Sequence, residues 1–97
     1  MTEGFNKAFE SKVRLGIMSL LMLHSRLDFN SLKEMLDVTD GNLASHSAAL
    51  EKLGFITVRK EFKGKKPYTS YQVSRPGKKA FLEHLNALET IIRNTNG

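Results

Sequence analysis

The sequence predicts a single α+β domain that is mostly helical, and three observations lead to this class. The chain has 97 residues, of which 40% are apolar, and this suits one compact domain with its own core. Apolar residues recur at helical spacing in four stretches. One segment rich in β-branched and aromatic residues, 55–73, instead favours two strands joined by a basic turn.

The first predicted helix spans residues 8–25 and is apolar on two opposed sides. One side carries Val13, Ile17, Leu20, Leu21 and His24, and the opposite side carries Leu15, Met18 and Met22. Two apolar sides need two partners, so we expect one to meet the core of the domain and the other to meet a second subunit. On such a stripe, His24 is expected to be a core histidine.

The second and third predicted helices, residues 31–37 and 40–53, are separated by a tight turn. Asn30 or Ser31 is expected to cap the second helix and Thr39 the third, while Gly54 ends the third. Their expected buried residues are Leu32, Met35 and Leu36, followed by Leu43, Leu50 and Leu53.

Two strands, 55–62 and 68–73, are predicted to form a hairpin over 55–73, and a last helix follows over 75–93. Ser74 is expected to cap this helix, with Pro76 in its first turn. The helix carries a heptad seam of Phe81, Leu85, Leu88 and Ile92. The seam packs either on the domain's own core or against a second subunit, and the spare side of the first helix favours the second subunit.

The positive charge of the chain is concentrated in one segment. The net charge is +5, but residues 59–79 hold eight lysines and arginines against Glu61 alone, a local sum of +7. The rest of the chain therefore sums to −2. A basic segment on a slightly acidic body indicates an anionic partner that meets one face of the protein.

The order of predicted elements is that of a winged helix-turn-helix. It has a three-helix core, a β-hairpin wing and an extra C-terminal dimerisation helix. In this arrangement the second helix of the pair enters the major groove, and the wing reaches phosphates or the adjacent minor groove. The predicted DNA-binding residues are Thr39, Asn42, Ser45 and His46 on the third helix and Lys60, Lys63, Lys65, Lys66 and Tyr68 on the wing.

Each of these residue types has a chemical reason to meet DNA. An asparagine such as Asn42 can pair with the N6 and N7 edge of adenine, and Ser45 and His46 can bond base edges or phosphates. Thr39 stands at a helix start, where free amides attract phosphate. Lysines neutralise phosphates. A polar helix face and a charged hairpin tip are also common on plain solvated surfaces.

Several stretches together resemble a family of short winged-helix transcriptional regulators related to the MarR and ArsR groups. They are residues 12–18, 28–33, 39–46, 50–56, 64–71 and 76–81. The resemblance implies a homodimer on palindromic operator DNA, built by the terminal helices. The dimer residues expected from it and from the apolar pattern are Leu15, Met18, Met22, Phe81, Leu85, Leu88 and Ile92.

The chain departs from the pattern of that family at three neighbouring positions. Ser47 stands where a large apolar residue is usual. Ala48 and Ala49 replace basic side chains that are common just after it. We therefore expect looser packing of the third helix and fewer phosphate contacts from it.

Other classes of function have little support in the sequence. The chain has no cysteine, no Gly-x-Ser-x-Gly motif and no phosphate-binding glycine loop. His24, His46 and His84 are widely separated, so neither an enzyme nor a metal or other cofactor is expected. No segment reads as a signal peptide or a membrane span, and a cytoplasmic location is expected.

The main alternative is a winged-helix module that binds a protein or structured RNA, because a fold does not determine function. The basic wing argues against a purely protein-binding role. For the DNA-binding hypothesis, two recognition helices about 34 Å apart would match half-sites one helical turn apart. The sequence does not identify an effector ligand.

Overall fold

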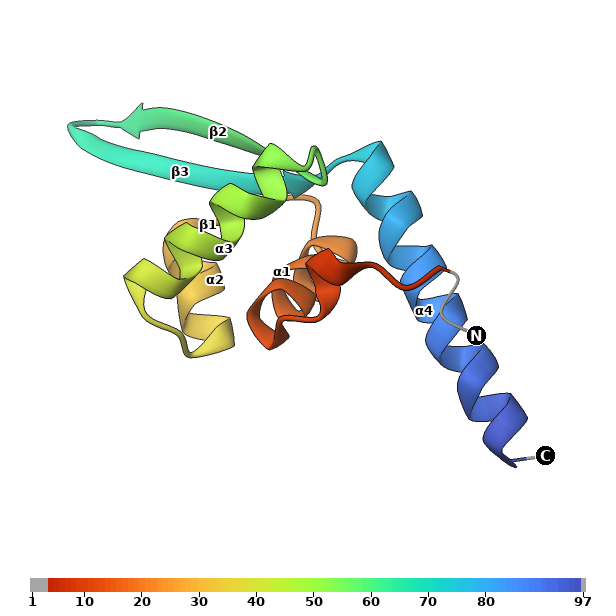
Figure 1. Ribbon diagram of the computed structural model, residues 1–97. Coiled ribbons are helices and arrows are strands. Elements are labelled where there is room, and N and C mark those ends of the chain that lie inside the picture. Colours follow the sequence, from red (N-terminus) through yellow and green to blue (C-terminus); the bar gives the residue numbers. More distant parts are fainter. Residues whose placement is uncertain (1–3, 97) are drawn as a thin grey trace.

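The computed structural model describes residues 4–96 and confirms the predicted α+β, mostly helical class. Three helices pack beneath a small sheet, a long hairpin extends to one side, and the last helix descends on the other (Figure 1). The elements are the 3-10 turn η1 (Lys7–Phe9), α1 (Lys12–Leu23), β1 (Leu27–Asp28), α2 (Phe29–Leu36), α3 (Asp40–Lys52), β2 (Ile56–Lys63), β3 (Lys66–Val73) and α4 (Arg75–Asn96).

The three strands form an antiparallel sheet in the order β1-β3-β2. The loop of the hairpin is shorter than predicted, because pairing continues to Lys63 and Lys66 and leaves only Gly64 and Lys65 in the turn. Gly64 adopts a left-handed φ of 66°, which glycine accepts without strain. Leu27 and Asp28 of β1 pair with Tyr71 and Ser70 of β3, so the sheet has a third strand besides the two of the predicted hairpin.

The first helix begins at Lys12, so the prediction of a helix from residue 8 is wrong. Ser11 sets this start, because its Oγ accepts a hydrogen bond from the amide of Arg14 at 3.3 Å. The helix ends at Leu23 and the chain turns away. His24 is therefore exposed, and the prediction that it is a core histidine is wrong.

The second helix begins two residues earlier than predicted, at Phe29. Its cap is Asp28, so the expectation of Asn30 or Ser31 is wrong. The Asp28 carboxylate accepts hydrogen bonds from the Ser31 hydroxyl at 2.6 Å and from its amide at 3.2 Å. The bond from the Ser31 hydroxyl is the main cause that lowers the pKa of Asp28, against the opposing effect of partial burial.

The core forms where α1, α2, α3 and the sheet meet. Its fully buried apolar residues are Ile17, Met18, Leu21, Leu32, Leu43 and Leu50. Met35 and Leu53 are about half exposed, so the prediction that they are buried is wrong. Helix α2 turns Leu32 inward and Met35 away, and Leu53 follows the last residue of α3, where the chain leaves the core.

The second apolar side of α1 is covered largely by the domain itself. Met18 is 0% exposed, and Leu15 and Met22 are half-buried against the same core. Phe81 of α4 is also buried, at 4% exposure. Met18 and Phe81 therefore leave the predicted dimer surface, because a residue enclosed by its own subunit has no area to offer a second one.

Helix α4 starts as predicted and then leaves the body of the protein (Figure 1). The Oγ of Ser74 accepts a hydrogen bond from the amide of Gly77 at 3.0 Å, which caps the helix. The helix continues to Asn96, three residues beyond the predicted end. The residues of the heptad seam differ in burial. Phe81 packs in the core of the domain, whereas Leu85, Leu88 and Ile92 are exposed.

The segment before α1 holds the first half of α4 in place. The ring of Phe9 lies 5.5 Å from those of Phe55 and Phe81 and 5.4 Å from that of His84. The backbone amide of Asn6 donates to Nδ1 of His84 at 3.3 Å. Among the helices that the structure describes, none combines the length and apolar character needed to cross a bilayer.

Candidate nucleic-acid interface

Helix α3 is fixed at its start by two side-chain contacts. The Oγ1 of Thr39 accepts a hydrogen bond from the amide of Asn42 at 3.1 Å, which confirms Thr39 as the cap. The ammonium of Lys33 in α2 lies 2.7 Å from a carboxylate oxygen of Asp40. The Thr39 cap ends the turn of the helix-turn-helix, and the ion pair connects the start of α3 to α2.

The two sides of α3 differ sharply. Leu43, Ser47 and Leu50 point into the core. Over its first turns the opposite side carries small and polar residues, and those that are exposed are Gly41, Asn42, Ala44, Ser45 and Ala48; Lys52 continues this side at the end of the helix. Because these side chains are short, the first turns of α3 can bring their backbone close to a flat or grooved surface. The sequence prediction included Asn42 and Ser45 but did not assign a role to Ala44 or Ala48.

His46 is placed differently from the other predicted contacts on α3. It is half-buried, and its Nδ1 accepts a hydrogen bond from Nε of Arg14 in α1 at 3.0 Å. This contact directs the ring toward α1, away from the middle of the exposed side. Arg14 lies 32 residues away in the chain, and no local pattern in the sequence predicts this pair.

Ser47 explains how α3 packs without the usual large residue. It is buried at 3% exposure beside Tyr71 of β3, and its hydroxyl donates to the carbonyl of Ala44 at 3.3 Å. Burial raises the pKa of the Tyr71 phenol, a hydrogen bond with Ser47 opposes the shift, and the charge of Glu51 adds to it. The small serine leaves room for the tyrosine, so the expectation of loose packing is wrong here.

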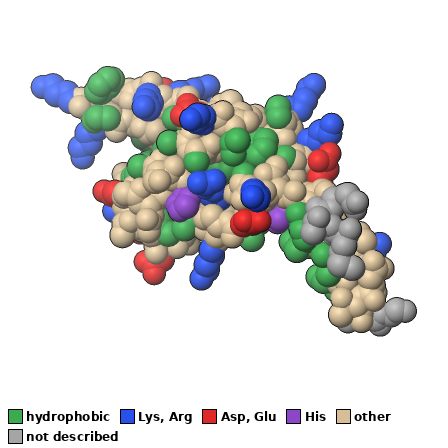
Figure 2. All heavy atoms as spheres, viewed as in Figure 1, with side chains coloured by type: hydrophobic (Ala, Val, Ile, Leu, Met, Phe, Trp, Pro, Cys, Tyr) green, Lys and Arg blue, Asp and Glu red, His purple; other side chains and the backbone are tan. Residues whose placement is uncertain are grey.

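The outer part of the β2–β3 hairpin, which we call the wing, carries exposed basic side chains. Figure 2 shows lysine and arginine side chains projecting from its outer end in several directions. The exposed basic residues of the wing are Arg59, Lys60, Lys63, Lys65 and Lys66. The ammonium of Lys63 lies 4.0 Å from the ring centre of Tyr68, which is half-buried. The four lysines predicted on the wing are thus all solvent-accessible.

The base of the wing is anchored to the helical body. Arg26 donates from Nη1 to the hydroxyl of Ser70 at 3.1 Å and from Nη2 to the side-chain oxygen of Gln72 at 2.7 Å. Ser70 is fully buried. These bonds connect β3 to the residue before β1, so the inner half of the hairpin is held while its outer half projects freely.

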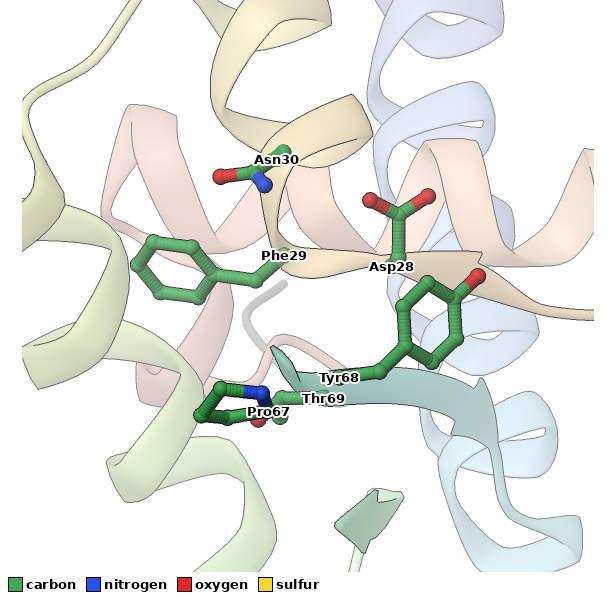
Figure 3. Close-up of a pocket in the computed structure, with 6 residues that line it drawn as sticks. All are labelled: Asp28, Phe29, Asn30, Pro67, Tyr68 and Thr69. Carbon is green, nitrogen blue, oxygen red and sulfur yellow. The ribbon is translucent and has the colours of Figure 1, made fainter. Parts of the chain in front are cut away.

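A small pocket lies where the wing meets the start of α2 (Figure 3). Its volume is about 160 Å³, and its lining residues are Asp28, Phe29, Asn30, Pro67, Tyr68 and Thr69. Pockets for small-molecule ligands usually measure about 300–1,000 Å³. This one is better described as the joint between wing and helix-turn-helix, and it places Tyr68 at that joint.

No group of three or more histidine and carboxylate side chains is placed to hold a metal ion within residues 4–96. The structure instead combines a capped helix with a small exposed side, a short helix before it, and a basic two-stranded wing. This combination defines the winged helix-turn-helix class of DNA-binding proteins.

The chain belongs to the winged helix DNA-binding domain family, whose model matches residues 13–92. It is similar to an uncharacterised protein of Methanocaldococcus jannaschii, with 34% identity over 91% of this chain and 96% of that protein. Residues 13–92 run from α1 into the exposed part of α4, so the family match includes α3 and the wing.

Solved structures agree with this assignment. A transcriptional regulator homologue from Pyrococcus horikoshii superposes with a TM-score of 0.85 and 29% identity, over 93% of this chain and 89% of that one. A protein from Enterococcus faecalis assigned to the MarR family matches with a TM-score of 0.72 and 22% identity, over 92% and 83% of the two chains. The protein therefore has the fold of winged-helix transcriptional regulators, and DNA binding is the function that this fold implies.

Proposed function

We propose that this protein is a homodimeric transcription regulator that binds specific sites on duplex DNA. Helix α3 enters the major groove, and the wing contacts the phosphate backbone or the adjacent minor groove. The observation that carries the proposal is the exposed side of α3, made of small and polar residues, beside a wing with exposed lysines. The major groove of B-DNA is wide enough to admit such a helix.

Base reading is assigned to the exposed side of α3. The side chain of Asn42 has the geometry to pair with the N6 and N7 edge of adenine, and Ser45 can bond either a base edge or a phosphate. Ala44 and Ala48 suit contact with thymine methyl groups, a kind of contact that alanine makes in the major groove. His46 has a smaller part in this scheme, because Arg14 already engages its Nδ1.

Phosphate contacts are assigned chiefly to the wing and to the start of α3. Lys60, Lys63, Lys65 and Lys66 are exposed and carry the positive charge that neutralises phosphates. Thr39 lies at the amino end of α3, where the helix dipole favours a phosphate. These contacts position the protein without selecting a sequence.

The second subunit is assigned to the exposed part of the α4 seam. Leu85, Leu88 and Ile92 lie at heptad spacing on a stretch of helix that projects from the body, and Leu15 and Met22 are half-buried on α1. Burial of this stripe against a second copy removes apolar area from water and creates two-fold symmetry. A symmetric protein then favours a palindromic operator.

The test is the salt dependence of binding to duplex DNA, measured for the wild type and two charge variants. Lys65→Ala/Lys66→Ala removes two charges from the wing, and Lys78→Ala/Lys79→Ala removes two exposed charges from α4 as a matched control. Each lost phosphate contact lowers the slope of log K against log salt by about 0.9. We expect the wing variant to lose up to about two units of slope and the control variant to lose less.

Two results would contradict the proposal. One is the absence of duplex binding by the wild type at low salt. The other is a preference for RNA loops or single strands over every duplex, which would favour the RNA-binding alternative. Equal salt slopes for the wing variant and the control would show that the wing does not contact DNA, but would leave the proposed contact of α3 untouched.

A further inference from the structure

One side chain on the wing does not fit a purely electrostatic role. Phe62 of β2 is 73% exposed, although it lies in a strand whose inner end is buried in the core. It stands directly opposite Pro67 of β3, so two apolar residues face each other near the outer end of the ribbon. The exposed apolar residues of α4 have the proposed dimer contact to cover them, but Phe62 lies on a different element.

The charges around Phe62 indicate what covers it. Lys60 and Lys63 lie on the same strand two residues before and one residue after it, and Lys65 stands in the turn. The neighbouring Glu61 is the one carboxylate on β2 and β3, so positive charge prevails there. Figure 2 shows hydrophobic side chains at the outer end of the wing with basic side chains on both sides of them. An apolar protein surface is a poor match for this setting, because lysines are depleted in the centre of protein–protein contacts.

Duplex DNA satisfies both features at once. Its phosphates line the two edges of a groove, and its base pairs offer an apolar stack between those edges. Proteins that contact the minor groove often insert a phenylalanine, proline or similar residue between base steps, while nearby basic residues hold the backbone. The wing of this chain has that composition, since Phe62 and Pro67 lie among lysines on a ribbon whose base is anchored.

We propose that Phe62 is an apolar wedge, which enters the minor groove beside each half-site and partly unstacks one base step. The inference rests on the proposed function and adds a source of sequence preference outside the bases read by α3. Pyrimidine–purine steps such as TA unstack most easily, so the wing selects for deformability without hydrogen bonding to a base. An operator of this protein should then carry a flexible step where the wing lies.

The first experiment measures unstacking directly. The probe is a duplex selected by the wild-type protein from a random-sequence library, with 2-aminopurine placed in turn at each adenine outside the half-sites. At saturating wild-type protein, we expect the fluorescence to rise only for probes at one base step beside each half-site, because a probe there is no longer quenched by stacking. Phe62→Thr should abolish the rise, since threonine keeps a strand-forming side chain but has no ring.

The second experiment separates the wedge from charge and from folding. Replacement of the flexible TA step by AA should weaken wild-type binding about fivefold and leave the affinity of Phe62→Thr unchanged. On the TA duplex, Phe62→Thr should bind about tenfold more weakly than the wild type, with the same salt slope. Phe62→Leu, which keeps a large apolar side chain, should recover much of the lost affinity.

The outcomes distinguish the wedge from the proposed function. If the wild type binds no duplex, both fail. If the wild type binds, but its saturated complex shows no fluorescence rise or the TA preference is equal in Phe62→Thr, the wedge alone is refuted. A control measurement of urea unfolding should show that Phe62→Thr folds as the wild type does, because substitutions of exposed residues usually change stability little.

Discussion

Single residues determine how closely α3 can approach a partner, and Ser47 is the clearest example. Ser47 lies on the inner side of α3 and leaves room for Tyr71 from the sheet. On the outer side, Ala44 and Ala48 have short side chains, so a partner can come close to the helix backbone. The sequence pattern located the outer side correctly for Asn42. It could not predict the packing of Ser47, because the partner residue comes from a strand 24 residues further along the chain.

The buried phenol of Tyr71 predicts a specific loss of stability at alkaline pH. Its pKa is raised in the folded protein above the ordinary value of 10.0, so unfolding favours loss of the proton. The neutral phenol therefore contributes to the free energy of unfolding. This stabilisation is complete below the ordinary pKa and is lost as the pH rises through the pKa of the folded state. Urea unfolding at about pH 9 and about pH 11 should show a larger decrease for the wild type than for Tyr71→Phe.

The matched substitution also provides the control for general alkaline damage. Both proteins lose lysine charges over the same range, so the difference between them isolates the phenol. Parallel decreases of the free energy of unfolding in the two proteins would show that the folded environment of Tyr71 does not favour its neutral form.

The elements themselves were largely predictable, while their starts were not. Hydrophobic spacing and turn residues indicated three helices, a hairpin and a final helix, and the structure contains all of them. The first residue of each helix depends on which of several neighbouring polar residues acts as the N-cap. Asp28 competes with Asn30 and Ser31, and Ser11 interrupts a helical pattern, so composition alone could not choose between them.

The junction between the wing and α4 predicts opposite effects for two glycine substitutions. A Cβ on Gly77 would collide with the backbone carbonyl of Phe55, whereas a Cβ on Gly41 in α3 would meet open space. Gly77→Ala should therefore destabilise the protein by about 1–3 kcal/mol, the usual range for overpacking. Gly41→Ala should be neutral or stabilise by up to about 1 kcal/mol, since alanine favours helix.

Urea unfolding measures both variants under the same conditions. The comparison tests the packing of α4 on the domain, because each variant adds one methyl group to a helix and only its surroundings differ. Equal stability of Gly77→Ala and the wild type would mean that the first turn of α4 does not lie against Phe55 as described.

At the level of the whole molecule, the projecting half of α4 carries apolar residues that a single chain leaves exposed. The molecule is 57 Å long but only 25 by 20 Å across, and α4 leaves the body at one end while the wing leaves it at the other (Figure 1). The heptad spacing predicted a partner for this helix. Burial of Phe81 by the segment before α1 was not predictable, because no periodic pattern connects residues so distant in the chain.

The proposed dimer predicts that charge on the exposed seam separates the subunits. Leu88→Asp should give a monomer in sedimentation equilibrium and weaken binding to a palindromic duplex strongly, because each half-site is then bound alone. Leu23→Asp is the matched control, since Leu23 is 78% exposed at the end of α1 and outside the seam. A Leu88→Asp protein that remains dimeric would exclude this seam as the interface.

Selection of DNA by the protein itself tests the central claim most directly. Wild-type protein and Asn42→Ala are each used to enrich duplexes from one random-sequence library, and the enriched sites are sequenced. The wild type should recover a two-fold symmetric site with half-sites about 10–10.5 base pairs apart, and Asn42→Ala should lose its preference at one symmetry-related pair of positions. Enrichment of no common site by the wild type, or identical sites from both proteins, would contradict base reading by the exposed side of α3.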